Sequence, residues 1–265
     1  MIILIIEQTN KLFCKVTSIF LRNGAVGGRI GCVLTFVMIG AVILPQKLSI
    51  FVCRYPSEII YSNLSISTPM FHPLENLDKY RVILASGSPR RKELLSLLDH
   101  PFTVDTSHSV DETVSPDLAP DEVPADLSRL KAYAFPLADD DDRLVITADT
   151  VVILDGEVLG KPRDKEEAVA MLRRLAERDQ TVVTGVTIRT CQRCETFTAT
   201  SRVEFAHLSD KEIRYYVDTY NPLDKAGAYG IQEWIGAAAI KSISGSFYNV
   251  MGLPVHKLYE KLKDF

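Results

Sequence analysis

The chain has few cysteines and no excess of basic residues. Its 265 residues include five cysteines, and its formal net charge is −4. A protein that binds nucleic acid without sequence preference is usually basic, so this charge argues against a nucleic-acid partner. Few cysteines in the globular part are typical of a reducing compartment, which predicts a cytoplasmic protein.

The sequence also lacks the residue spacing of a zinc site. Cys191 and Cys194 form a single Cys-x-x-Cys pair, whereas a four-ligand zinc site needs a second pair. The five histidines show no ligand spacing, and we interpret them as structural. We therefore expect two reduced thiols on a strand or hairpin, with a metal role as the less favoured alternative.

The first 69 residues differ in composition from the remainder. They carry six Lys/Arg against two Asp/Glu, whereas the other 196 residues carry 24 against 32. Residues 30–44 are apolar and uncharged, but a membrane-spanning helix needs about 20 such residues. We interpret residues 1–69 as a leader or extension that is disordered, translated from a mis-chosen start codon, or, less favoured, membrane-associated. We expect one globular domain over residues 70–265.

From Arg81 onward, short β-branched runs alternate with helical patterns, which is typical of an α/β domain. The stretch 155–156 predicts a hairpin turn, and Ser88, Asp164 and Ser209 stand where they would cap helices. We expect strands at 81–85, 144–147, 150–154, 181–190 and 196–205, and helices at 89–98, 125–135, 166–177, 209–220 and 254–262.

A turn of small residues connects the first expected strand to the first expected helix. It comprises residues 86–91 and ends in Arg90 and Arg91, in the first turn of the helix. The positive end of a helix dipole attracts anions, and two arginines there oppose the dipole unless an anion binds. Guanidinium groups suit phosphate oxygens. The turn therefore predicts a phosphate site other than a P-loop, with two solvated arginines as the alternative.

Three other segments are weaker signals when each is taken alone. Asp149 lies between apolar runs and is either paired with a metal or another cation, a general base toward water, or a strand-end residue in a hydrogen-bonded turn. Lys161 lies in a basic turn that contacts a second phosphate or faces solvent. The glycine-rich stretch 224–232 ends in Gln232, whose amide suits the edge of a base, although a structural loop explains the stretch equally well.

In combination, these segments resemble the Maf family of nucleoside triphosphate pyrophosphatases. The matching segments are VILASGSPRRKELL, ITADTVVILDGEVLGKPRD, LDKAGAYGIQ and GSFYNVMGLP, and the resemblance covers about residues 81–265. It implies an α/β, ITPase-like fold with an elongated mixed β-sheet flanked by helices, and two lobes around a central cleft. It also implies a homodimer.

The resemblance further implies a reaction and roles for particular residues. Family members cleave a nucleoside triphosphate between its α- and β-phosphates, releasing a nucleoside monophosphate and pyrophosphate. Asp149 would activate water, with a divalent metal (Mg²⁺ or Mn²⁺) that Asp149 and Glu112 hold. The positions that hold the triphosphate are Ser86, Arg90, Arg91, Lys131 and Lys161, and those linked to substrate choice are Arg90, Thr150 and Gln232.

The form of two motifs narrows the expected substrate. SPRR and GAYGIQ are similar to the subgroup that acts on dTTP and UTP, which implies a house-cleaning hydrolase for these and for modified pyrimidine nucleotides. Glu233 and Trp234 depart from related chains, which often carry glycine after the glutamine. The alternative function is a nucleotide-binding regulator of cell division with little catalysis.

Overall fold

The computed structural model describes residues 72–108, 110–113 and 117–265, and four short strands before them. The chain divides into two compact units, Met1–Met70 and Phe71–Phe265. In the first unit, β1 (Ile2–Thr9) pairs with β2 (Phe13–Leu21), and β3 (Ile50–Tyr55) pairs with β4 (Glu58–Ser62), both antiparallel. The apolar run at 30–44 lies outside the described residues. Of the helices that are described, none has the length and apolar character to cross a membrane.

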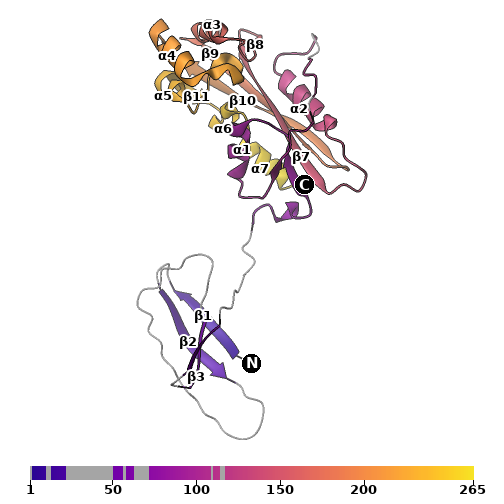
Figure 1. Ribbon diagram of the computed structural model, residues 1–265, viewed down its shortest axis with the longest axis vertical. Helices are drawn as coiled ribbons and strands as arrows, with labels where there is room; N and C mark the ends of the chain where they lie inside the picture. Colours follow the sequence, from indigo (N-terminus) through magenta and orange to yellow (C-terminus); the bar gives the residue numbers. More distant parts are fainter. Residues whose placement is uncertain are drawn as a thin grey trace. The chain divides into compact units, whose positions relative to one another are not determined.

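The second unit is built on one mixed β-sheet (Figure 1). The strand order is β11-β10-β9-β7-β5-β6, and β8 also pairs with β7. β5 runs parallel to β6 and β7, and the other pairs are antiparallel. The strands are β5 (Arg81–Leu84), β6 (Thr103–Val104), β7 (Arg143–Leu154), β8 (Glu157–Leu159), β9 (Asp179–Arg189), β10 (Cys194–Phe205) and β11 (Ile240–Ser244).

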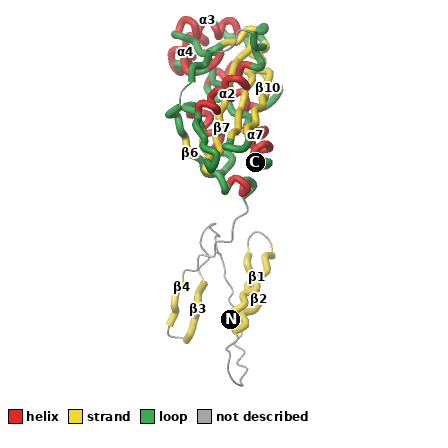
Figure 2. The backbone as a smooth tube through the Cα atoms, turned by 90° about the vertical axis from the view of Figure 1, so that its right-hand side faces the viewer, coloured by secondary structure: helices red, strands yellow, loops and turns green. Residues whose placement is uncertain are grey.

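Helices cover both faces of this sheet. Thr187 of β9 bonds Ser128 of α2, and Thr184 of β9 bonds the carbonyl of Asn249 in α6. Because successive strand residues face opposite sides, the odd spacing of 184 and 187 puts α2 and α6 on opposite faces. In Figure 2, α2 lies across strands β7 and β10. The helices are α1 (Pro89–Ser96), α2 (Val123–Ala134), α3 (Lys165–Leu175), α4 (Asp210–Tyr220), α5 (Trp234–Ala239), α6 (Phe247–Met251) and α7 (Val255–Leu262), with short 3₁₀ turns η1 (Glu75–Leu77), η2 (Pro222–Asp224) and η3 (Ala226–Ala228).

One edge of β7 has two different partners, with an opening between them. Residues 143–146 pair with β5, and residues 152–154 pair with β8. Between these stretches, residues 147–151 pair only with β9, on the opposite edge, within the part of the chain that is described. The opening separates a lobe with β5, β6 and α1 from a lobe with β8 and α3 (Figure 1). The expected α/β fold, with two lobes around a cleft, is confirmed.

Most of the expected elements are present, with corrected boundaries. The runs at 144–147 and 150–154 belong to one unbroken strand, because β9 pairs along the whole stretch between them. Asp155 and Gly156 form the expected hairpin turn, both with positive φ. Asp164 and Ser209 cap α3 and α4 as expected, whereas Ser88 precedes α1 without a side-chain capping bond. The sequence patterns gave no signal for α5, α6 and β11.

The two cysteines lie where β9 turns into β10. Cys194 is the first residue of β10, and both thiols are free. The Cys191 thiol donates to the carbonyl oxygen of Asp141 at 3.3 Å. The described residues hold no group of three or more His, Cys, Asp or Glu side chains able to bind a metal by themselves. The expectation of reduced thiols on a hairpin agrees with this arrangement.

Candidate active site

A pocket of about 730 Å³ opens beside the unpaired edge of β7. Small-molecule sites commonly have volumes of roughly 300–1,000 Å³, so the pocket has room for a nucleotide-sized ligand. Its walls come from the turn before α1, from α2 and β7, and from the loops after β8 and α4. The lining includes all nine residues that the sequence singles out: Ser86, Arg90, Arg91, Glu112, Lys131, Asp149, Thr150, Lys161 and Gln232.

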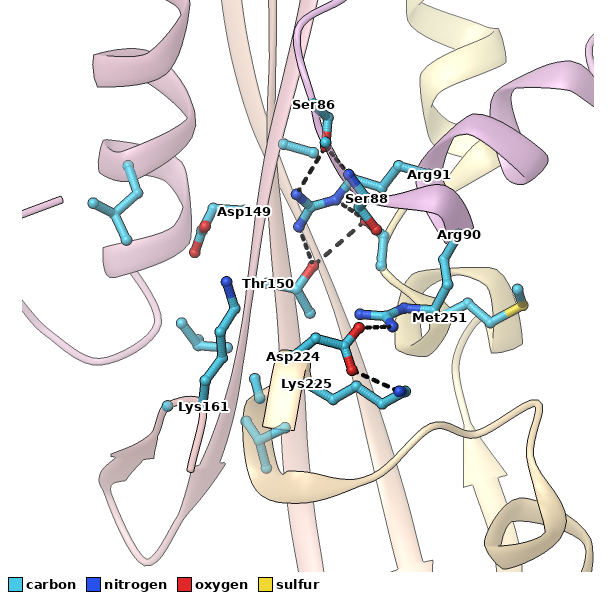
Figure 3. Close-up of a pocket in the computed structure, with 18 of the residues that line it drawn as sticks. Ser86, Ser88, Arg90, Arg91, Asp149, Thr150, Lys161, Asp224, Lys225 and Met251 are labelled. Carbon is cyan, nitrogen blue, oxygen red and sulfur yellow. Dashed lines mark hydrogen bonds and ion pairs between the residues drawn. The ribbon is translucent and has the colours of Figure 1, made fainter. Parts of the chain in front are cut away.

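Asp149 and Thr150 are neighbours on β7, and their side chains line the pocket from opposite faces of the strand (Figure 3). Asp149 lies on the face covered by α2, where its Oδ1 is 2.7 Å from Lys131 Nζ. Thr150 lies on the other face, where its hydroxyl is 3.1 Å from the Arg91 guanidinium. Both reach the pocket because β7 has no strand partner on this edge at these positions.

Lys131 joins the two candidate metal ligands. Its Nζ lies 2.7 Å from Asp149 Oδ1 and 3.0 Å from Glu112 Oε1. The Asp149 side chain is 14% exposed and that of Glu112 is 52% exposed, so the pair spans the pocket from wall to mouth. The single ammonium charge lies between the two carboxylates and reduces their mutual repulsion, and one net negative charge remains.

Gly185 sets how closely α2 approaches this pair. Gly185 is the β9 residue opposite Asp149. A Cβ added to it would lie 2.2 Å from the carbonyl oxygen of Pro124 in α2. Only glycine therefore lets α2 lie close enough to β9 for Lys131 to reach Asp149. The sequence alone gives no reason to single out this glycine.

Arg91 is the most unusual charge in the pocket. Its guanidinium donates to three neutral oxygens: Gly252 O at 2.9 Å, Thr150 Oγ1 at 3.1 Å and Ser86 Oγ at 3.5 Å (Figure 3). Among the described residues, no carboxylate lies within ion-pair distance of it. Burial lowers the pKa of Arg91, and the nearby charge of Asp149 opposes that shift. Since arginine stays charged in proteins, the pocket holds a half-buried cation without an anion.

Arg90 is held differently, by an ion-pair chain that reaches the glycine-rich loop. Its NH1 lies 2.9 Å from Asp224, which also binds Lys225 at 2.7 Å (Figure 3). Lys225 in turn lies 3.2 Å from Glu233. Burial raises the pKa of Asp224, but the hydrogen bonds from Lys225 and Arg90 outweigh it and lower that pKa below its ordinary value. These ion pairs connect Arg90, at the start of α1, to the loop that carries Gln232.

Tyr216 of α4 completes that connection. Its hydroxyl donates to Glu233 and accepts from the backbone N–H of Gly230 at 3.0 Å. Burial, together with the bond to Glu233, raises the pKa of Tyr216. Sequence reasoning missed Asp224, Lys225 and Glu233 as one network, because no spacing rule links residues on a 3₁₀ turn and a later loop.

Lys161 and Gln232 lie at the rim of the pocket, and both are exposed. Lys161 has no acidic partner among the described residues, so it and Arg91 are the two lining cations without a carboxylate. A pocket with two such cations, one deep and one at the mouth, favours an extended polyanion.

Comparison with known proteins gives consistent results. The Maf family, described as Maf-like protein, matches residues 81–265. A dTTP/UTP pyrophosphatase of Bacteroides thetaiotaomicron is 57% identical over 190 residues, which cover 72% of this chain and 98% of that protein. A dTTP/UTP pyrophosphatase of Porphyromonas gingivalis is 55% identical over 194 residues, with 72% and 98% covered.

A third relative shows a similar level of identity. A dTTP/UTP pyrophosphatase of Bacillus velezensis is 51% identical over 185 residues, which cover 70% of this chain and 96% of that protein. Among solved structures, a HAM1 protein from Coxiella burnetii aligns with a TM-score of 0.40 and 14% identity, over 70% of this chain and all of that one, a likeness too slight to carry an argument. On the family match and on these identities, this chain belongs to the Maf family.

Proposed function

We propose that this chain is a nucleoside triphosphate pyrophosphatase. It hydrolyses the bond between the α- and β-phosphates of dTTP and UTP, and of modified pyrimidine nucleotides, to a nucleoside monophosphate and pyrophosphate. The relatives above bear the name dTTP/UTP pyrophosphatase and align over 96% to 98% of their length. The proposed role is the removal of unwanted nucleotides in the cytoplasm.

The half-buried Arg91 guanidinium, which has no carboxylate partner among the described residues, is the observation that carries this proposal. Three of its five N–H donors bind neutral oxygens, and the described residues offer no partner to the other two. Planar guanidinium groups match phosphate oxygens in pairs. A phosphate bound there would neutralise the cation, and Lys161 at the rim would hold a second phosphate of the same chain.

Asp149 is the proposed general base. Cleavage of a phosphoanhydride needs a water molecule in line with the leaving group and neutralisation of the oxygens around phosphorus. Asp149 would take the proton of the attacking water, while Lys131 holds its carboxylate in place. The leaving pyrophosphate carries the negative charge that Arg91 and Lys161 neutralise.

The residues present fit a divalent cation that arrives with the substrate. Mg²⁺ is usually held by one or two carboxylates together with substrate phosphates. Asp149 and Glu112 are such a pair, since they already share the cation of Lys131. They would hold Mg²⁺ or Mn²⁺, which supplies further neutralisation of the phosphate oxygens.

Substrate choice would come from Arg90, Gln232 and Thr150. The ion-pair chain through Asp224 ties Arg90 to the loop of Gln232, so both residues hold a fixed distance from the phosphate turn. The amide of Gln232 can donate to and accept from the edge of a pyrimidine. Thr150 would contribute through Arg91, which its hydroxyl contacts.

A turnover assay with a binding control tests the proposal. We expect pyrophosphate release from UTP and dTTP with Mg²⁺, and little from ATP or GTP. Asp149→Asn should bind the nucleotide but lose most turnover, because the amide cannot take a proton. A wild-type protein that binds UTP without hydrolysing it would instead favour the regulator of cell division. Near-normal turnover of Asp149→Asn would remove Asp149 from the role of base.

The family resemblance also implies a homodimer. Light scattering coupled to size-exclusion chromatography measures this directly, and a monomer at assay concentration would exclude it. The acidic charge of residues 70–265 supports the absence of a nucleic-acid partner.

A further inference from the structure

We propose that Thr184 is a positioning residue that orients the Arg91 guanidinium through a one-way chain of hydroxyl groups. Thr184 lies on β9, is fully buried and does not line the pocket. This inference rests on the proposed function, because it assigns Arg91 to phosphate binding. It adds a residue that acts on the site without touching the ligand.

The chain begins at Arg91, which can only donate. The Arg91 NH2 group lies 3.1 Å from Thr150 Oγ1, so the Thr150 oxygen must accept there. Thr150 Oγ1 lies 2.9 Å from Thr184 Oγ1. Thr184 Oγ1 in turn lies 3.1 Å from the carbonyl oxygen of Asn249, which can only accept. Thr184 therefore donates a hydrogen bond to the Asn249 carbonyl and accepts one from the Thr150 hydroxyl.

The end of the chain is fixed by α6. The Asn249 side chain is fully buried and donates to Val182 O at 3.2 Å and to Ser201 Oγ at 3.0 Å. Its backbone N–H donates to the cap residue Ser246. The carbonyl that accepts the hydrogen bond from Thr184 is thus anchored to β9 and β10.

The direction of the chain matters for Arg91. Without Thr184, the Thr150 hydroxyl retains one weaker acceptor, Gly252 O at 3.4 Å, which already accepts from Arg91 Nε. The Thr150 hydroxyl would then rotate and lose its alignment with Arg91. Hydrogen bonds in such chains also polarise one another, so the loss of Thr184 weakens the Arg91–Thr150 bond as well. Arg91 would keep its charge but sample more orientations.

Three substitutions test this role. Thr184→Val removes the hydroxyl at nearly constant volume, and Thr184→Ser keeps it. We expect Thr184→Val to weaken binding of inorganic pyrophosphate and to lower kcat/KM for UTP, each by about three- to ten-fold, the effect of one lost hydrogen bond. Thr184→Ser should recover most of both. Thr187→Val is the matched control, since it deletes a hydroxyl that is equally buried on the same strand but bonds Ser128 and Thr196.

A double-mutant cycle separates positioning from loss of stability. In a Thr150→Val background the chain is already cut, so Thr184→Val should change pyrophosphate affinity by less than about two-fold. Additive effects, or equal losses in Thr184→Val, Thr184→Ser and Thr187→Val, would overturn the role. A wild-type protein that binds no pyrophosphate would overturn it too. Titration calorimetry with pyrophosphate does not depend on turnover, so absent UTP hydrolysis would refute the proposed function alone.

Discussion

Replacement of Gly185 by alanine should damage both the stability and the activity of this protein. The added Cβ would lie 2.2 Å from the Pro124 carbonyl oxygen, 2.3 Å from its carbonyl carbon and 2.4 Å from the Ala125 nitrogen. These are backbone atoms of α2, so no side-chain rotation can relieve the clash. The helix must move away from β9 by about an ångström before ordinary van der Waals contact is restored.

The size of the effect follows from that displacement. Overpacking a core typically costs about 1–3 kcal/mol, and a clash with helix backbone belongs at the upper end. For a domain of this size, 3 kcal/mol corresponds to a fall in Tm of roughly 6–12 °C. Lys131 moves with α2, and its Nζ is 2.7 Å from Asp149. A misplacement of about 1 Å in the groups that position a catalytic residue can reduce kcat about 100-fold.

Thermal unfolding and initial-rate measurements on Gly185→Ala check both numbers. Gly160→Ala is the control for stability, because a Cβ added to Gly160 meets nothing within 4 Å. We expect the Tm of the control to stay within about 2 °C of the wild type. If Gly185→Ala unfolds at the wild-type temperature and retains its kcat, α2 does not depend on this glycine and the argument fails.

Three other outcomes are expected. Lys131→Met should bind Mn²⁺ more tightly than the wild type in the absence of nucleotide, because Asp149 and Glu112 lose their shared cation. EPR titration measures this binding. Equal or weaker binding would show that Lys131 does not compete with the metal. Hydrogen bonds from Arg143 lower the pKa of Asp141 to about 2. The pair therefore stabilises the folded state fully at pH values above the ordinary carboxyl pKa of about 4, and this stabilisation is lost as the pH falls toward 2. The free energy of unfolding should therefore fall less between pH 5 and pH 2.5 in Arg143→Met, and parallel profiles would contradict this. A protein that starts at Met70 should keep full activity, and an insoluble or inactive product would exclude the interpretation of residues 1–69 as a dispensable leader.

The sequence by itself identified the residues with strong local patterns. The turn 86–91 is recognisable because small residues, a proline and two arginines follow a buried strand, an arrangement that suits anion binding at a helix N-terminus. The caps of α3 and α4 follow from the residues at their first turns. Asp149 stands out because it interrupts an apolar run. Each of these signals lies within about ten residues of chain.

Only the tertiary structure decided how these residues act together. The edge of β7 is open at Asp149 because β5 stops pairing at residue 146 and β8 starts pairing at residue 152. The residues of β7 alone do not determine either of these limits. Gly185 is opposite Asp149 only in the register of β7 with β9.

The same holds for the two networks around the arginines. Thr184 reaches Arg91 through Thr150, a residue on another strand. Asp224 pairs with Arg90 across 134 positions of sequence. Local patterns report which side chains can form a helix, a cap or a turn, whereas hydrogen bonds and ion pairs between distant segments depend on packing that no short stretch of sequence contains.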